Sequence, residues 1–363
     1  MAEERQEVYE VEQVASTEMV KCSSCGANMR FDPETQMLSC DHCGRKESVA
    51  KTVSASELSL FSDIAQIGAE TEENAVFTCD NCGAKVVLNG TETATACPFC
   101  GTPHVRKAEE LSGLKPNAVL PFLFDKDKAI EYSKAWAKKK AYAPRDFKKS
   151  LKPESVNGIY TPCFTFDSNT YSTYYGRVGK RHTRVVGSGK NRRTETYIVW
   201  RNISGTYTDA FNDVLIAAGE KIDQKKIDKL SPYETDSARE YDEKYVLGYM
   251  SYRYDREISD CWEDAKTMID RVIRRGILSQ YVYDVVDYLN VSTEHSAVTY
   301  KYVMLPVYVG NFKYKKKIYN FYVNGTTGKV HGKTPVSALK VLFTVFGCLA
   351  LVGIIGLLVY FFG

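Results

Sequence analysis

The sequence predicts small tandem four-cysteine zinc ribbons plus an α+β domain with a mainly antiparallel sheet and one C-terminal transmembrane helix. Eight of the 11 cysteines of this 363-residue chain fall into two units with identical spacing. Aromatic and β-branched runs with helical segments follow, and the last stretch carries no charge. The length leaves room for one sizeable core besides the two small units.

The first cysteine unit reads "CSSCGANMRFDPETQMLSCDHC" and the second reads "CDNCGAKVVLNGTETATACPFC". Each contains two Cys-x-x-Cys pairs, which turn their thiolates toward one ion and together complete a tetrahedral zinc site. A glycine follows each pair, where the chain often needs a positive φ. We therefore expect two structural Zn²⁺ ions, each held by one set of ligands: Cys22, Cys25, Cys40 and Cys43; Cys79, Cys82, Cys97 and Cys100.

Other uses of these cysteines fit less well. A disulfide framework belongs to secreted domains, whereas the start "MAEERQEVYEVEQ" is acidic and has no apolar signal-peptide core. Evenly paired motifs are also not the design of a thioredoxin-like redox site. His42, inside "CDHC", is an alternative ligand, although a surface position in the knuckle is the favoured interpretation. Four-thiolate zinc sites are closed to substrate, so they are structural.

The composition divides the chain into six segments. Residues 1–18 hold six glutamates against one arginine and are expected to be a disordered acidic tail. The expected order after it is as follows: ribbon 1 at 19–48, a linker at 49–76, ribbon 2 at 77–106, the α+β domain at 107–337 and the transmembrane helix at 338–363.

Within the α+β domain, hydrophobic periodicity predicts two main helices, at 126–140 and at 258–289, the second with a break at Gly276. Aromatic and β-branched runs predict strands. These strands are expected at 158–167, 170–178, 194–209 and 245–255, with a final hairpin over 298–332. Asn324-Gly325 is a strong turn signal in that hairpin.

The final stretch "VLFTVFGCLALVGIIGLLVYFFG" is long enough as a helix to cross a bilayer core of about 30 Å. Lysines precede it and no lysine or arginine follows it. Because basic residues favour the cytoplasmic side, we expect a tail-anchored, single-pass protein of the cell membrane with its N-terminal bulk in the cytoplasm.

No catalytic constellation is recognisable. The five histidines are scattered, and "GSGKNR" has Asn191 where a phosphate loop needs Ser or Thr. We therefore expect a non-enzymatic protein. The net charge of +3 is nearly balanced, but lysine and arginine gather at 138–149, 179–193 and 313–317. These clusters are solvated faces, contacts to anionic lipid head groups, or, less favoured, contacts to nucleic acid.

The paired cysteine motifs, "GIYTPCFTFD", "YVMLPVYVGNF" and "FYVNGTTGKVHGKTP" before the apolar stretch resemble a family of bacterial membrane proteins with tandem TFIIB-type zinc ribbons. Members are often labelled primosomal or replication restart helicase, yet this chain lacks a Walker A lysine motif. The resemblance implies a membrane scaffold that, with another membrane protein, recruits an SPFH (flotillin-like) protein and phage-shock protein A in envelope stress. The alternative is a membrane-tethered nucleic-acid-binding protein.

Overall fold

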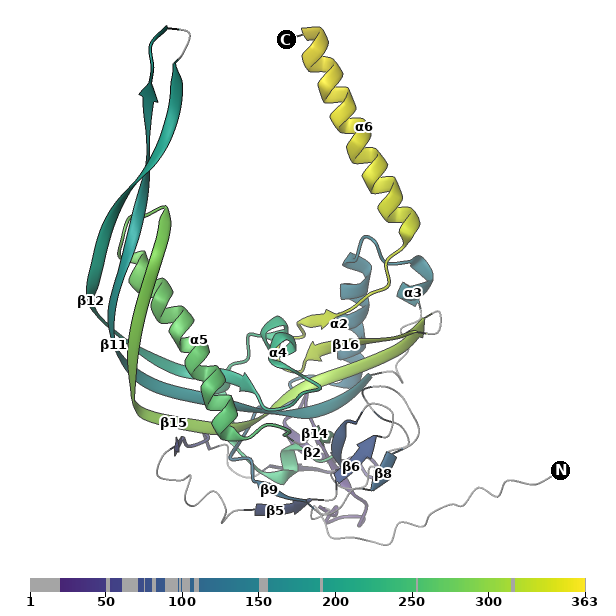
Figure 1. Cartoon of the computed structure of the whole chain (residues 1–363). Coiled ribbons are helices and arrows are strands. Elements are labelled where there is room, and N and C mark those ends of the chain that lie inside the picture. The colour runs from purple at the N-terminus through teal and green to yellow at the C-terminus, as the bar shows by residue number, and fades with distance from the viewer. Residues whose placement is uncertain are drawn as a thin grey trace, which may run out of the picture.

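The structure is a computed structural model of the chain. It describes residues 20–49, 53–60, 71–74, 76–79, 83–88, 97, 99, 105–107, 111–149, 156–189, 192–252, 254–314 and 317–362. The predicted tail at 1–18 lies outside these residues. A long, mainly antiparallel sheet curves through the molecule, with helices on its concave side and the cysteine units below it (Figure 1).

Three long strands form the sheet's backbone: β11 (Val156–Val186), β12 (Arg193–Ala217) and β15 (Val285–Tyr314). β11 lies between the other two and pairs antiparallel with both. Register shifts beside Asp167 interrupt both ladders, and such bulges bend a strand without ending it. The strands therefore continue past the core into a projecting arm, which rises on the left of Figure 1.

Helix α5 (Ile258–Ser279) supports this arm. Its buried face contains Cys261, Trp262, Ala265, Ile269, Ile273 and Ile277. The Trp262 ring packs against the Phe166 ring of β11, with 5.4 Å between centroids. The helix predicted from residue 258 is thus confirmed as far as Ser279, and Val272, outside the buried face, is 39% exposed.

At the other end of the sheet, α2 (Lys126–Lys139) packs near β11, β16 (Lys317–Asn324) and β17 (Val330–Gly332). The Asp125 carboxylate accepts a hydrogen bond from Lys128 N and caps the helix, which satisfies one of its free N–H groups. α3 (Arg145–Lys149) and α4 (Gln224–Leu230) complete this region. The predicted helix at 126–140 is confirmed.

Shorter strands extend the sheet. β10 (Ala118–Val119) pairs parallel with β15, and β14 (Met250–Tyr252) pairs parallel with β11. β13 (Arg239–Glu240) and β4 (Leu58–Ser59) pair antiparallel with β10 and β15. β5 (Thr71–Asn74) and β9 (Leu111–Leu114) form a separate pair. The mainly antiparallel α+β prediction is confirmed.

Four local predictions were wrong. The strand expected at 245–255 is limited to β14, because Tyr245 ends a short 3-10 helix and the chain turns before Met250. The segments 158–167 and 170–178 are parts of one strand, β11, because the bulge near Asp167 carries the chain past its polar residues. The helix expected to 289 ends at Ser279, and Val285 starts β15, where it pairs with Gly179. Gly276 does not break the helix, which continues to Ser279. The glycine instead allows Tyr207 to approach closely, since a Cβ at this position would lie 2.6 Å from Tyr207 Cζ.

Helix α6 (Ala338–Phe362) rises from the body on the right of Figure 1. Over Ala338–Gly356 its mean hydropathy is 2.4, and none of this stretch is buried against the rest of the chain. A single apolar helix is therefore present where the sequence predicts one, and it is long and apolar enough to cross a membrane.

Candidate metal centre

The first cysteine unit brings four thiols together. Cys22 and Cys25 lie before β1 (Met29–Asp32), Cys40 ends β2 (Met37–Cys40), and Cys43 precedes β3 (Lys46–Ser48). All four sulfurs lie within 4.8 Å of one another. The Cys22–Cys43 and Cys25–Cys40 sulfur pairs are each 3.5 Å apart. Four sulfurs bound to one zinc at about 2.3 Å lie about 3.8 Å apart, so this group could hold a metal ion.

Two backbone knuckles position these sulfurs. Gly26 N donates to Cys22 O and Gly44 N donates to Cys40 O, each at 2.9 Å. Both glycines have positive φ, +72° and +71°, a conformation that costs glycine little. The short loops therefore turn both thiols of each pair inward, while the hairpin β1–β2 joins the two knuckles.

The local electrostatics favour a cation. The backbone N–H of Ser24 is the main cause that lowers the pKa of Cys22, to about 7, which favours the thiolate form that binds metals. At Cys25, the backbone N–H of Ala27 lowers the pKa, but burial and the neighbouring thiols raise it to about 12. Several thiolates at this spacing repel one another, and a bound cation offsets that repulsion.

The first unit is docked on the α+β body. Phe31, on β1, is 2% exposed. Its ring meets the Tyr245 ring edge-on, and its N–H donates to Leu247 O at 3.1 Å. Gln36, in the turn between β1 and β2, donates to Phe122 O at 2.8 Å. The ribbon is therefore a fixed part of the surface.

Only part of the second cysteine unit belongs to the described residues. Cys79, at the end of β6 (Val76–Cys79), and Cys97 are both buried. Gly83 N donates to Cys79 O at 2.8 Å and Gly83 has φ +67°, so this knuckle repeats the geometry of the first unit. Cys82 and Cys100 lie outside the described residues.

The strands of the second unit join the large sheet. β7 (Lys85–Leu88) pairs with β14 and β6, and β8 (Val105–Lys107) pairs with β6. The Phe99 ring packs edge-on against the Tyr252 ring of β14, with 5.5 Å between centroids. This unit is therefore also held on the body.

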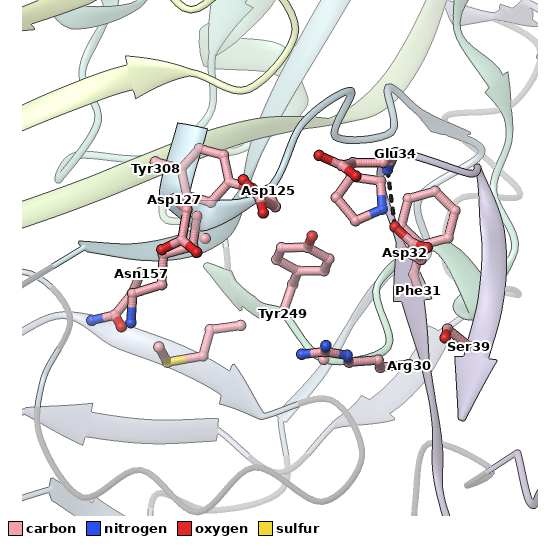
Figure 2. A pocket seen from close by; sticks show the side chains of 15 residues that line it. Arg30, Phe31, Asp32, Glu34, Ser39, Asp125, Asp127, Asn157, Tyr249 and Tyr308 are labelled. Carbon is pink, nitrogen blue, oxygen red and sulfur yellow. Dashed lines mark hydrogen bonds between the residues drawn. The ribbon is translucent and has the colours of Figure 1, made fainter. Parts of the chain in front are cut away.

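A cavity of about 500 Å³ lies between the first unit and the body, and Figure 2 shows its lining. Acidic side chains line it, and two of them, Asp32 and Asp125, accept hydrogen bonds from nearby backbone groups. Asp32 accepts hydrogen bonds from Glu34 N and Thr35 Oγ1, which lower the pKa that burial would raise. Asp125 caps α2. These carboxylates stabilise turns and the helix end.

The chain is 32% identical, over 323 residues, to the uncharacterized protein YdjG of Bacillus subtilis (strain 168). The match covers 88% of this chain and 91% of that protein. The chain belongs to the YdjG family. No protein-family model and no solved structure matches it. The TFIIB-type resemblance therefore rests on the sequence motifs alone.

The three cysteines outside the two units, and His42, lie apart from the four-thiol group. Cys163 and Cys261 are buried core residues, and Cys348 is exposed on α6. His42 is exposed and is not part of the four-thiol group. The described residues of the basic segment 179–193 lie toward the end of the arm, where residues 180–186 of β11 pair with residues 193–199 of β12 beyond the start of β15.

Proposed function

We propose that this YdjG-family chain is a non-enzymatic, membrane-anchored zinc-ribbon adaptor, with α6 as a single transmembrane span and the remaining described residues in the cytoplasm. One observation carries the proposal: a helix of bilayer length that has no charged residue after Lys340 and whose stretch Ala338–Gly356 is not buried against the body. An apolar surface of this size is costly in water and is stabilised by lipid.

The base of α6 is attached to the body. Lys340 Nζ donates to Ala141 O and Ala143 O, and Ser337 N donates to Tyr142 O at 2.8 Å. These contacts fix where the helix leaves the fold. A body held this way presents one defined side to the bilayer, which suits a scaffold.

The zinc ribbons are proposed as the surface that partners read. A closed four-thiolate site leaves no position for substrate, and the first unit is fixed on the body by Phe31 and Gln36. By resemblance, the partners are another membrane protein, an SPFH (flotillin-like) protein and phage-shock protein A. We propose one zinc ion at the four thiols of the first unit and a second at Cys79, Cys82, Cys97 and Cys100.

Membrane recruitment tests this function. Cells carrying the chain with Cys79→Ser and Cys82→Ser should lose the SPFH partner from the membrane fraction, while the variant itself stays there. Cys348→Ser, which removes an exposed thiol of α6, is the matched control and should recruit normally. Recruitment that persists in the zinc-free protein would refute the adaptor role of the ribbons.

A membrane-tethered nucleic-acid-binding role is the second candidate, because the end of the arm is basic. Arg181, Arg192 and Arg193 are exposed there, and Arg184 lies over the Tyr197 ring at 5.6 Å. However, Arg184 and Arg193 both pair with Glu195, which reduces the free positive charge. This role requires affinity that falls steeply with salt and that disappears when the four arginines are replaced by glutamine.

A further inference from the structure

A second cavity, of about 340 Å³, lies where α4, β16 and β17 meet. Its lining is basic: Lys226 comes from α4, Lys317 from β16, His331 from β17, and Lys333 directly follows β17. The ladder pairs Tyr322 with His331 and Phe321 with Gly332, so the position of His331 is fixed by the sheet. Helix α4, strands β16 and β17 and the residue after β17 thus bring four basic side chains around one cavity.

The charge around His331 is strongly positive. Burial, followed by the charges of Lys229, Lys140 and Lys226, lowers the pKa of His331, and Asp223 opposes these lysines. Asp223 binds Lys226 Nζ at 3.0 Å and is half exposed. One carboxylate, Asp223, therefore opposes several lysines near His331. Because the positive charges outnumber it, an anion in the cavity would be attracted electrostatically.

The cavity lies next to the base of α6. Lys333 precedes Ala338 by five residues, which span at most about 18 Å at about 3.6 Å per residue. Lys140 ends α2 immediately before the turn that holds Lys340. Figure 1 shows α4 and α2 on the concave side of the sheet, below the rising α6.

We infer that this cavity binds a phosphate group, such as the phosphate of an anionic lipid head group at the surface where α6 enters the membrane. Lys226, Lys317 and Lys333 would contact the phosphate oxygens through charge-assisted hydrogen bonds. The lipid source, but not phosphate binding itself, rests on the proposed membrane anchor.

Calorimetric titration of the full-length chain in a non-ionic detergent tests the site. The probes are inorganic phosphate, dihexanoyl-phosphatidylglycerol and dihexanoyl-phosphatidylcholine. The double variant Lys226→Gln, Lys333→Gln should bind phosphatidylglycerol about tenfold or more weakly than the wild type, because two charge-assisted contacts are lost. The control Lys225→Gln, Lys134→Gln removes the same charge from exposed positions outside the lining and should bind normally.

The three probes separate the sources. Binding of phosphatidylglycerol alone supports a lipid head group, and equal binding of inorganic phosphate supports a free phosphate ligand in the same cavity. Equal loss in both double variants, or no binding of either phosphate probe, overturns the inference. Membrane attachment is measured separately, by fractionating cells that carry the same variants. A chain found in the soluble fraction that still binds phosphate would refute the membrane anchor but not the phosphate site.

Discussion

The ring of Phe31 meets the ring of Tyr245 edge-on, with 5.4 Å between centroids and 66° between planes. Phe31 belongs to the first cysteine unit, whereas Tyr245 belongs to the α+β body, more than 200 residues along the chain. This contact makes the ribbon a fixed surface feature rather than a module on a tether. The account of the protein as a rigid adaptor depends on it.

Removing that contact should loosen the ribbon. We expect Phe31→Ala to cost about 3–5 kcal/mol, as for other buried phenylalanines, and to speed hydrogen exchange in residues 20–49 while α5 keeps its protection. Val53→Ala, at a half-exposed side chain, is the control and should change neither. Unchanged exchange in the Phe31 variant would show that the ribbon is held by other contacts.

Metal content should follow the cysteine sets. Purified wild type should contain two zinc ions per chain, and Cys22→Ser with Cys25→Ser should lower this to one, measured by plasma mass spectrometry. Cys79→Ser with Cys82→Ser should do the same, whereas Cys348→Ser should keep both ions. One ion in the wild type would limit the metal centre to the four thiols grouped in the structure.

Stability should depend on Asp167, which lies in a partly buried charge network with Glu57, Asp213 and Lys301. Burial raises the pKa of Asp167 to about 6, although the backbone N–H of Asp213 lowers it, and Glu57 adds to the rise. Lys301 Nζ lies 2.7 Å from Asp213 Oδ1. Because the folded pKa exceeds the unfolded value of about 3.9, this carboxyl stabilises the fold at low pH and that contribution is lost as pH rises through about 6.

Asp167→Asn should therefore raise the melting temperature at pH 7.5, with a gain of about 1 kcal/mol after allowance for partial solvent screening. The gain should shrink at pH 5.5, where the wild-type carboxyl is mostly protonated. Exposed Asp287→Asn serves as the control and should change little at either pH. A variant that is less stable at pH 7.5 would mean that Lys301 needs the Asp167 charge.

The base of α6 should depend on Lys340. Lys340→Ala removes two charge-assisted hydrogen bonds to Ala141 O and Ala143 O, each worth about 1.5–3 kcal/mol when well formed. We expect faster hydrogen exchange over residues 333–340 in the detergent-solubilised chain. Lys134→Ala, on the exposed side of α2, should leave this exchange as in the wild type. Equal exchange in both variants would show that Ser337 alone holds the helix.

Features that depend on residues close together in the sequence were predicted correctly. The cysteine spacing and following glycines predicted the knuckle at Cys22–Gly26, and the apolar spacing predicted α2 and the buried face of α5. The end of α5 was missed because residues 280–289 alternate in a way that suits either helix or strand. Pairing with β11 at Gly179 decides for strand, and no local signal encodes a partner about a hundred residues away.

Only part of the candidate metal centre could be predicted from the sequence, for the same reason. Ligand identity in the first unit could be predicted from spacing, but the docking through Phe31 and Gln36 could not, since it depends on Tyr245 and Phe122. The cavity at His331 was also missed. "KYKKK" drew attention to Lys317, yet Lys226 and Lys333 join it only when α4 packs beside β16 and β17.

Purification of the full-length chain from its own membranes in a mild detergent, followed by mass spectrometry of what accompanies it, tests the adaptor most directly. The account predicts an SPFH protein and phage-shock protein A in stoichiometric amounts with the wild type, and their loss from the Cys79→Ser, Cys82→Ser variant. Nucleic acid or its processing enzymes in their place would contradict it and would make the ribbons and the basic arm a nucleic-acid-binding device.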